Sequence, residues 1–207
     1  MIGWLIFALL CLVLVGAFEF QGMLMRKRWR RDLAPLAAVL GEDSRSVRVS
    51  RRRMRASVSG QYRGHAAATE LGYKPETGID EFTSFDRWLF TVRIEIGRHA
   101  IAWVAASEKP RVVDSAEGSL WHITSDPPEL AARLEAAGLT QLLRRTWPDA
   151  HCAYESATGV ICYYRRTPRR RQFLLTRGWW LPTADEFRIL LDLLINVAAL
   201  TQQVSSI

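Results

Sequence analysis

The sequence predicts an α+β protein: one N-terminal transmembrane helix, followed by a cytoplasmic antiparallel sheet with helices packed on one side. Three observations predict this fold class. The first 25 residues are almost wholly apolar. Short segments with alternating apolar and polar residues and turn signals follow them. A long amphipathic segment then begins at a helix-capping motif near residue 183.

The apolar run predicts a membrane anchor. As a helix, residues 2–25 would be roughly 36 Å long at 1.5 Å per residue, and a bilayer core of about 30 Å needs only about 20 residues. Glu19 is the only ionisable residue in the run and lies near the expected cytoplasmic edge. Its carboxylate can reach the headgroup layer or pair with a partner helix.

The basic run 26–31 predicts the orientation of this anchor. No basic residue precedes it, so the positive-inside rule places the N-terminus outside and the rest of the chain in the cytoplasm. We therefore expect a bacterial inner-membrane protein divided into an anchor (1–25), a basic juxtamembrane stop (26–31) and a cytoplasmic α+β domain (32–207). The alternative is a cleaved signal peptide, but the segment lacks a basic n-region and the basic block would resist export.

The domain is expected to start with a helix and a short strand. Residues 32–41 predict the helix, since Asp32 can cap its start and Gly41 can end it. Pro35 fits a first helical turn. Residues 47–50 predict the strand.

A hairpin and the clearest strand follow. The pair Arg63-Gly64 between residues 57–62 and 65–71 predicts a β-hairpin. Residues 88–96 alternate strictly, which predicts a strand with one buried face. We expect residues 101–106 to be its hairpin partner.

Further on, residues 120–124 predict a strand and residues 125–129 a helix start. That helix is expected to end at Gly138, and residues 139–146 predict a second short helix. Residues 151–165 predict another hairpin, which would bring its two cysteines close together.

The last predicted element is the best helix of the chain. Residues 183–186 form a capping box that opens a helix over residues 184–202. Its wide apolar arc predicts packing on the sheet, or docking of part of that arc on a partner.

The sequence contains no recognisable catalytic motif. The sequence lacks a P-loop, a dinucleotide-binding glycine motif, a zinc-protease helix, a nucleophile elbow and an EF-hand loop. The four histidines are scattered, and the cysteines show no zinc spacing. Cys152 has His151 beside it, but adjacent strand residues face opposite ways. We therefore expect no catalytic residue, no metal and no cofactor.

Three basic clusters mark the candidate contact surfaces: residues 26–31, 51–55 and 165–177. Clustered arginines bind phosphate, and the nearest phosphates to a tethered domain belong to the inner leaflet. The residues expected to contact the membrane surface, lipid headgroups or a partner are Trp4, Glu19, Arg26, Lys27, Arg28, Trp29, Arg30, Arg31, Arg169, Arg170, Arg171, Arg177, Trp179 and Trp180. A solvated charged face is the alternative, and nucleic acid is not expected.

Several structural motifs resemble a loose class of uncharacterised bacterial single-pass membrane proteins. The motifs are Leu-Ala-Pro-Leu at 33–36, Tyr-Arg-Gly at 62–64, the stretch from Asp126 to Leu139, and Leu-Asp-Leu-Leu at 191–194. The resemblance covers most of the chain. It implies an anchor and an Arg-rich cytoplasmic α+β domain, and it implies no activity and no site residues.

These features favour a non-catalytic accessory subunit of a larger inner-membrane complex, respiratory or photosynthetic. Its expected partners are the membrane, anionic lipid headgroups and other integral-membrane subunits. Two alternatives stay open: a stand-alone membrane-tethered module that binds anionic lipid or an acidic partner, and an enzyme with an unrecognised site.

Overall fold

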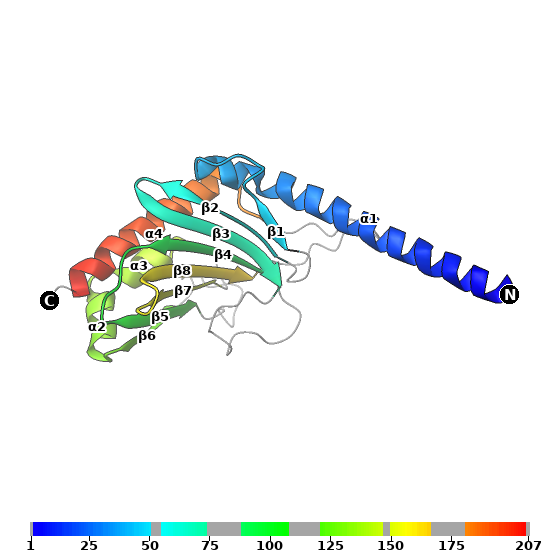
Figure 1. Ribbon diagram of the computed structural model, residues 1–207. Coiled ribbons are helices and arrows are strands. Elements are labelled where there is room, and N and C mark those ends of the chain that lie inside the picture. The colour runs from blue at the N-terminus through cyan, green and yellow to red at the C-terminus, as the bar shows by residue number, and fades with distance from the viewer. Residues whose placement is uncertain are drawn as a thin grey trace, which may run out of the picture.

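The computed structural model describes residues 2–50, 55–73, 88–107, 121–146, 150–166 and 181–205. These residues form an α+β fold with an eight-stranded antiparallel sheet in the order β1-β2-β3-β4-β8-β7-β5-β6 (Figure 1). The strands are β1 (Arg48–Ser50), β2 (Arg55–Tyr62), β3 (His65–Tyr73), β4 (Trp88–Glu95), β5 (Ala102–Ser107), β6 (Trp121–Asp126), β7 (Ala150–Glu155) and β8 (Val160–Arg166). The helices are α1 (Ile2–Val39), α2 (Glu129–Ala136), α3 (Leu139–Leu143) and α4 (Ala184–Ser205). The helices pack against one face of the sheet, where most of the core lies.

The helix α1 runs without a break through the expected anchor, the basic stop and the first helix of the domain. The expectation of a separate helix capped by Asp32 is therefore wrong. Arginine and lysine are good helix formers, so residues 26–31 give the helix no reason to stop. The Asp32 carboxylate instead pairs with Arg28 one turn earlier, at 3.5 Å. The helix does end before Gly41, which has φ +75°.

The last three turns of α1 are part of the domain core. Their buried residues are Trp29, Leu33, Leu36 and Ala37, and Leu40 directly after the helix is buried too. The helix contacts β1, β2 and α4. Its C-terminal end is joined to the sheet by a hydrogen bond from the Gln61 amide to the Leu40 carbonyl, 3.2 Å long.

Two of the three predicted hairpins are confirmed, at residues 57–71 and 151–165. In β2–β3, Tyr62 is opposite His65, and the two turn residues Arg63 and Gly64 both have positive φ. A two-residue hairpin turn of type I′ requires this. In β7–β8, Glu155 is opposite Val160.

The expected pairing of residues 101–106 with the strand at 88–96 is wrong. The strand β4 lies between β3 and β8, and β5 lies between β6 and β7. Alternation predicts which face of a strand is buried but not which strand lies beside it. The buried face of β4 was predicted correctly, with Phe90, Val92 and Ile94 in the core.

The two cysteines of the second hairpin do not face each other. Cys152 is opposite Tyr163, while Cys162 is opposite Ala153. Because successive residues of a strand point to opposite faces, the two thiols lie on opposite faces of the sheet. Cys152 belongs to the main core and Cys162 to a small second cluster.

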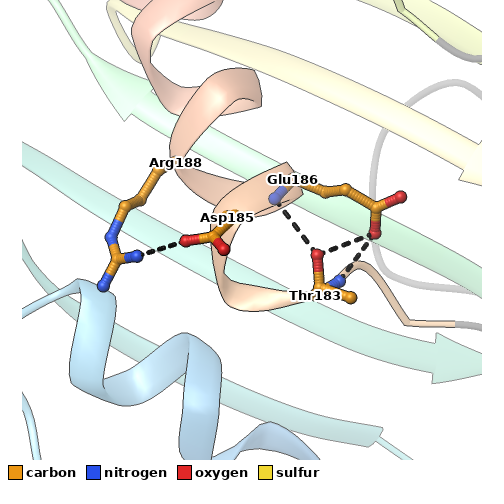
Figure 2. Close-up of polar contacts among 4 residues, drawn as sticks. All are labelled: Thr183, Asp185, Glu186 and Arg188. Atoms are coloured by element: carbon orange, nitrogen blue, oxygen red, sulfur yellow. Dashed lines mark hydrogen bonds and ion pairs between the residues drawn. The ribbon is translucent and has the colours of Figure 1, made fainter.

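The capping box at the start of α4 is confirmed (Figure 2). The Thr183 hydroxyl accepts from the Glu186 amide at 3.2 Å, and the Glu186 carboxylate accepts from the Thr183 amide at 2.8 Å. Beyond it, α4 buries one face in the core, from Phe187 to Val204. In α2, by contrast, no side chain caps the first turn, because the N-cap residue is Pro128, which has no hydrogen-bonding side chain.

Candidate functional site

The N-terminal part of α1 projects clear of the domain (Figure 1). Large apolar side chains are exposed along it, at Trp4, Phe7, Leu10, Leu12, Val13, Phe20, Met23 and Leu24. Trp4 is 79% exposed, and its ring meets Phe7 edge-on. Glu19 and Cys11 are exposed on the same segment. The exposed apolar side chains of this segment make it the candidate surface for contact with an apolar environment.

The predicted contact residues after the apolar run separate into two groups. The exposed group is Arg26, Lys27, Arg30 and Arg31, with Arg28 half-buried. Trp29 differs, because it is only 2% exposed and lies in the core. The expectation that its ring faces the headgroup layer is wrong, since that ring packs inside the domain. The other predicted contacts, Arg169, Arg170, Arg171, Arg177, Trp179 and Trp180, lie outside the described residues.

One end of the sheet lies on the side from which α1 leaves the domain. The register places Arg55 beside Gly72, Gly72 beside Leu89, and Leu89 beside Arg166. The arrows of β3 and β8 point toward the side on which α1 projects (Figure 1). The opposite end carries the Arg63-Gly64 turn, near the C-terminal end of α1 at Leu40. The last residues of β1 and β8, Ser50 and Arg166, therefore lie at the end of the sheet nearest the projecting helix.

The sheet face opposite the helices carries a second feature, a hollow of about 140 Å³ over β1 to β4. It is lined by Ser46, Arg48, Ser57, Val58, Ser59, Ala68, Thr69, Glu70, Thr91 and Arg93. The register explains the hollow, because Ser57, Ser59 and Ala68 are small residues on adjacent strands of this face. Longer side chains surround them.

Glu70 is the carboxylate of this hollow and is 9% exposed. Its Oε1 lies 3.8 Å from Arg55 Nη1, which is an ion pair too long for a hydrogen bond. Gly72 leaves room for this approach, since a Cβ there would lie 3.2 Å from Glu70 Oε1 and 3.1 Å from Arg55 Cβ. Among the described residues, Glu70 Oε1, Thr91 Oγ1 and Arg93 Nε have no hydrogen-bond partner.

The thiols of Cys152 and Cys162 are free and buried. Burial raises the pKa of the Cys152 thiol, and it also raises the pKa of the Cys162 thiol. Only the thiolate attacks an electrophile, so neither sulfur is activated at neutral pH. His151 is adjacent to Cys152 on β7 and faces the other side of the sheet.

The four histidines lie on separate elements. His65 begins β3, His99 follows β4, His122 lies on β6 and His151 lies on β7. Over the described ranges, no group of three or more His, Cys, Asp or Glu residues is placed to hold a metal ion.

Among the helices searched within the described residues, α4 is long and apolar enough to cross a membrane by length and composition, with a mean hydropathy of 1.3. Its position argues against that role. Phe187, Leu191 and Leu194 are completely buried in the core between α4 and the rest of the domain.

No known protein family, no curated protein and no solved structure matches this chain.

Sequence reasoning missed the hollow. Arg48, Glu70 and Arg93 stand on three different strands, and their spacing along the chain carries no motif. The available signal was the set of polar residues that alternate with the core residues of β3 and β4. This signal is weak, because a sheet face that is open to solvent normally tolerates any polar residue.

Proposed function

We propose that this protein is an accessory subunit of a larger inner-membrane complex, anchored by the N-terminal part of α1 and docking its cytoplasmic domain on neighbouring subunits. The observation that carries the proposal is the absence of a break in α1 between the exposed apolar segment and the buried seam that begins at Trp29.

The exposed apolar segment supports the anchor. Burying apolar side chains such as Trp4, Phe7 and Leu12 in lipid stabilises the helix by about 25 cal/mol for each Å² removed from water. The arginines and lysine that follow would lie in the inner headgroup layer, where each basic residue contributes about 1 kcal/mol with anionic lipid. By the positive-inside rule the domain is then cytoplasmic.

The continuous helix supports a docked subunit over a freely moving module. A module that searches for partners is usually joined to its anchor by a flexible linker, whose composition sets its reach. Here only Arg26, Lys27 and Arg28 separate Met25 from the buried Trp29, less than one and a half turns of helix. Such a junction holds the domain at one height and one orientation against the bilayer, which suits fixed contacts with other subunits.

The strand ends nearest the projecting helix agree with this orientation. If the helix crosses the bilayer, Arg55 and the ends of β3 and β8 face the membrane. The hairpin turn at Arg63-Gly64 and the C-terminal end of α4 then face the cytoplasm. Anionic lipid would contact the strand ends that face the membrane, and partner subunits would contact the sides of the domain.

The test is gentle detergent extraction of the full chain from its native membranes, followed by sizing and mass spectrometry of the proteins that co-migrate with it. The proposal predicts a stable large assembly whose other members identify the pathway. Migration alone, at the size of a monomer or dimer, would overturn the subunit role.

A substitution at Lys27 tests the coupling itself. Lys27→Pro removes one backbone donor and places its ring against the Met23 carbonyl, which costs about 3 kcal/mol in a helix interior. We expect this variant to stay in the membrane and to leave the assembly. Lys27→Ala is the matched control, because it removes the same charge but keeps the helix, and it should remain assembled.

A further inference from the structure

The hollow on the open face of the sheet has the walls of an anion site. Arg48 on β1 and Arg93 on β4 both line it. Three strand spacings separate them, roughly 14 Å at about 4.8 Å per strand. Ser57, Ser59 and Ala68 on the intervening strands β2 and β3 are small, and the Glu70 carboxylate stands beside them on β3. The two arginines therefore line one hollow from strands at its opposite edges.

The charge of the lining favours an anion. Arg48 and Arg93 are its cations and Glu70 is its carboxylate. Arg55 pairs with Glu70 from outside the lining and offsets its charge. The residues around the hollow therefore carry an excess of positive charge, and guanidinium groups bind phosphate oxygens through paired hydrogen bonds.

Donors are available there. Thr91 is fully buried, and its Oγ1 has no hydrogen-bond partner within the described part of the chain. The same holds for Arg93 Nε. A buried donor that makes no hydrogen bond destabilises the fold, so both groups gain from a ligand oxygen. Ser57 and Ser59 add hydroxyl groups at the floor.

The volume limits the ligand. Sites for drug-sized molecules and cofactors occupy about 300–1,000 Å³, whereas this hollow holds about 140 Å³. A nucleotide does not fit, but a single tetrahedral oxyanion does. We propose that the hollow binds one phosphoryl group between Arg48 and Arg93, with the Thr91 hydroxyl as a further donor. The site does not depend on α1 crossing a membrane, and the phosphoryl group can belong to a soluble phosphate or to a lipid headgroup.

The test is calorimetric titration of the full chain in nonionic micelles, first with inorganic phosphate and then with short-chain phosphatidylglycerol. Saturable binding of inorganic phosphate supports the site with a soluble ligand. Binding of the lipid alone supports it with a headgroup ligand. Saturable binding of neither overturns the proposal.

Matched variants assign any binding to the hollow. Arg48→Gln alters an exposed side chain and should leave the fold intact, yet weaken binding about tenfold through the loss of one charge-assisted contact. Arg98→Gln, in the exposed segment after β4, is the control and should bind like the unmodified chain. Equal weakening by both variants would show a general charge effect and overturn the site.

A second pair of variants tests the sign of the charge effect. Glu70→Gln removes the carboxylate of the hollow and should strengthen phosphate binding several-fold. Glu95→Gln removes an exposed carboxylate on β4, on the same face of the sheet as Glu70 but outside the lining of the hollow. This variant should change phosphate binding little. Weaker binding by Glu70→Gln, in a variant that still unfolds cooperatively, would contradict an anion ligand.

Discussion

The seam between α1 and the sheet depends on Gly60, and the substitution Gly60→Ala tests it. Gly60 lies on β2 beneath the last turn of α1. A Cβ built there would collide with the Leu40 carbonyl oxygen and would lie 2.9 Å from Glu42 Cγ. The carboxylate side chain can rotate away, but the carbonyl belongs to the backbone. The end of α1 must therefore move.

The expected cost follows from these contacts. Inserting a methyl group into a packed site costs about 1–3 kcal/mol. Moving the Leu40 carbonyl also weakens its 3.2 Å hydrogen bond with the Gln61 amide, worth about 1 kcal/mol. Alanine also restricts the conformations of the unfolded chain, which raises the free energy of unfolding by about 0.4–1 kcal/mol. The net loss in free energy of unfolding should be about 1–3 kcal/mol.

The assay is urea unfolding of the full chain in nonionic micelles, followed by tryptophan fluorescence, because Trp29 is buried at this seam. Gly16→Ala is the control, since a Cβ at Gly16 meets nothing within 4 Å. It should be at least as stable as the unmodified chain, because alanine is the better helix former. If Gly60→Ala is within about 0.5 kcal/mol of that chain, the size of a surface substitution, the close approach of α1 to β2 is refuted.

Two further predictions concern stability. Thr183→Ala should lower the free energy of unfolding by about 1 kcal/mol through loss of the α4 cap. A double-mutant cycle with Glu186→Gln should be clearly non-additive, because the two side chains share their hydrogen bonds, and additive effects would contradict the capping box. Because burial raises the pKa of the Cys152 thiol above its ordinary value of 9.0, the unfolded chain releases that proton first as the pH rises. Stability is then unaffected below about pH 9 and falls above it, by about 1.4 kcal/mol per pH unit for this thiol. Urea titrations at increasing alkaline pH should show a shallower loss in Cys152→Ala, and an unchanged slope would contradict this reasoning.

Local signals in the sequence were reliable. Arg63-Gly64 predicted its hairpin because a two-residue turn needs two positive φ values, and Gly64 supplies one without strain. The capping box at 183–186 predicted the start of α4 because the two side chains satisfy each other's backbone donors. These features depend on residues within one turn of each other.

Features that depend on distant residues were not predictable. The strand after Ile101 pairs with β6 and β7 and not with β4, a choice made by strands far along the chain. Trp29 looked like an interfacial aromatic ring, but it becomes a core residue because α1 continues into the domain. The hollow joins Arg48, Glu70 and Arg93 only through the sheet register.

The central claim is that α1 crosses the membrane with its N-terminus outside and continues into a cytoplasmic domain. Thiol labelling with a membrane-impermeant maleimide in intact cells tests it most directly. In a Cys11→Ser background, one variant carries Gly3→Cys and another carries Ser44→Cys, which lies at an exposed position after α1. The remaining cysteines, Cys152 and Cys162, are buried and do not interfere.

If α1 crosses the membrane with its N-terminus outside, Gly3→Cys is labelled in intact cells and Ser44→Cys is labelled only after lysis. Labelling of both variants only after lysis would place both ends of α1 in the cytoplasm. That result would contradict the transmembrane anchor and, with it, the fixed attachment of the domain to the bilayer.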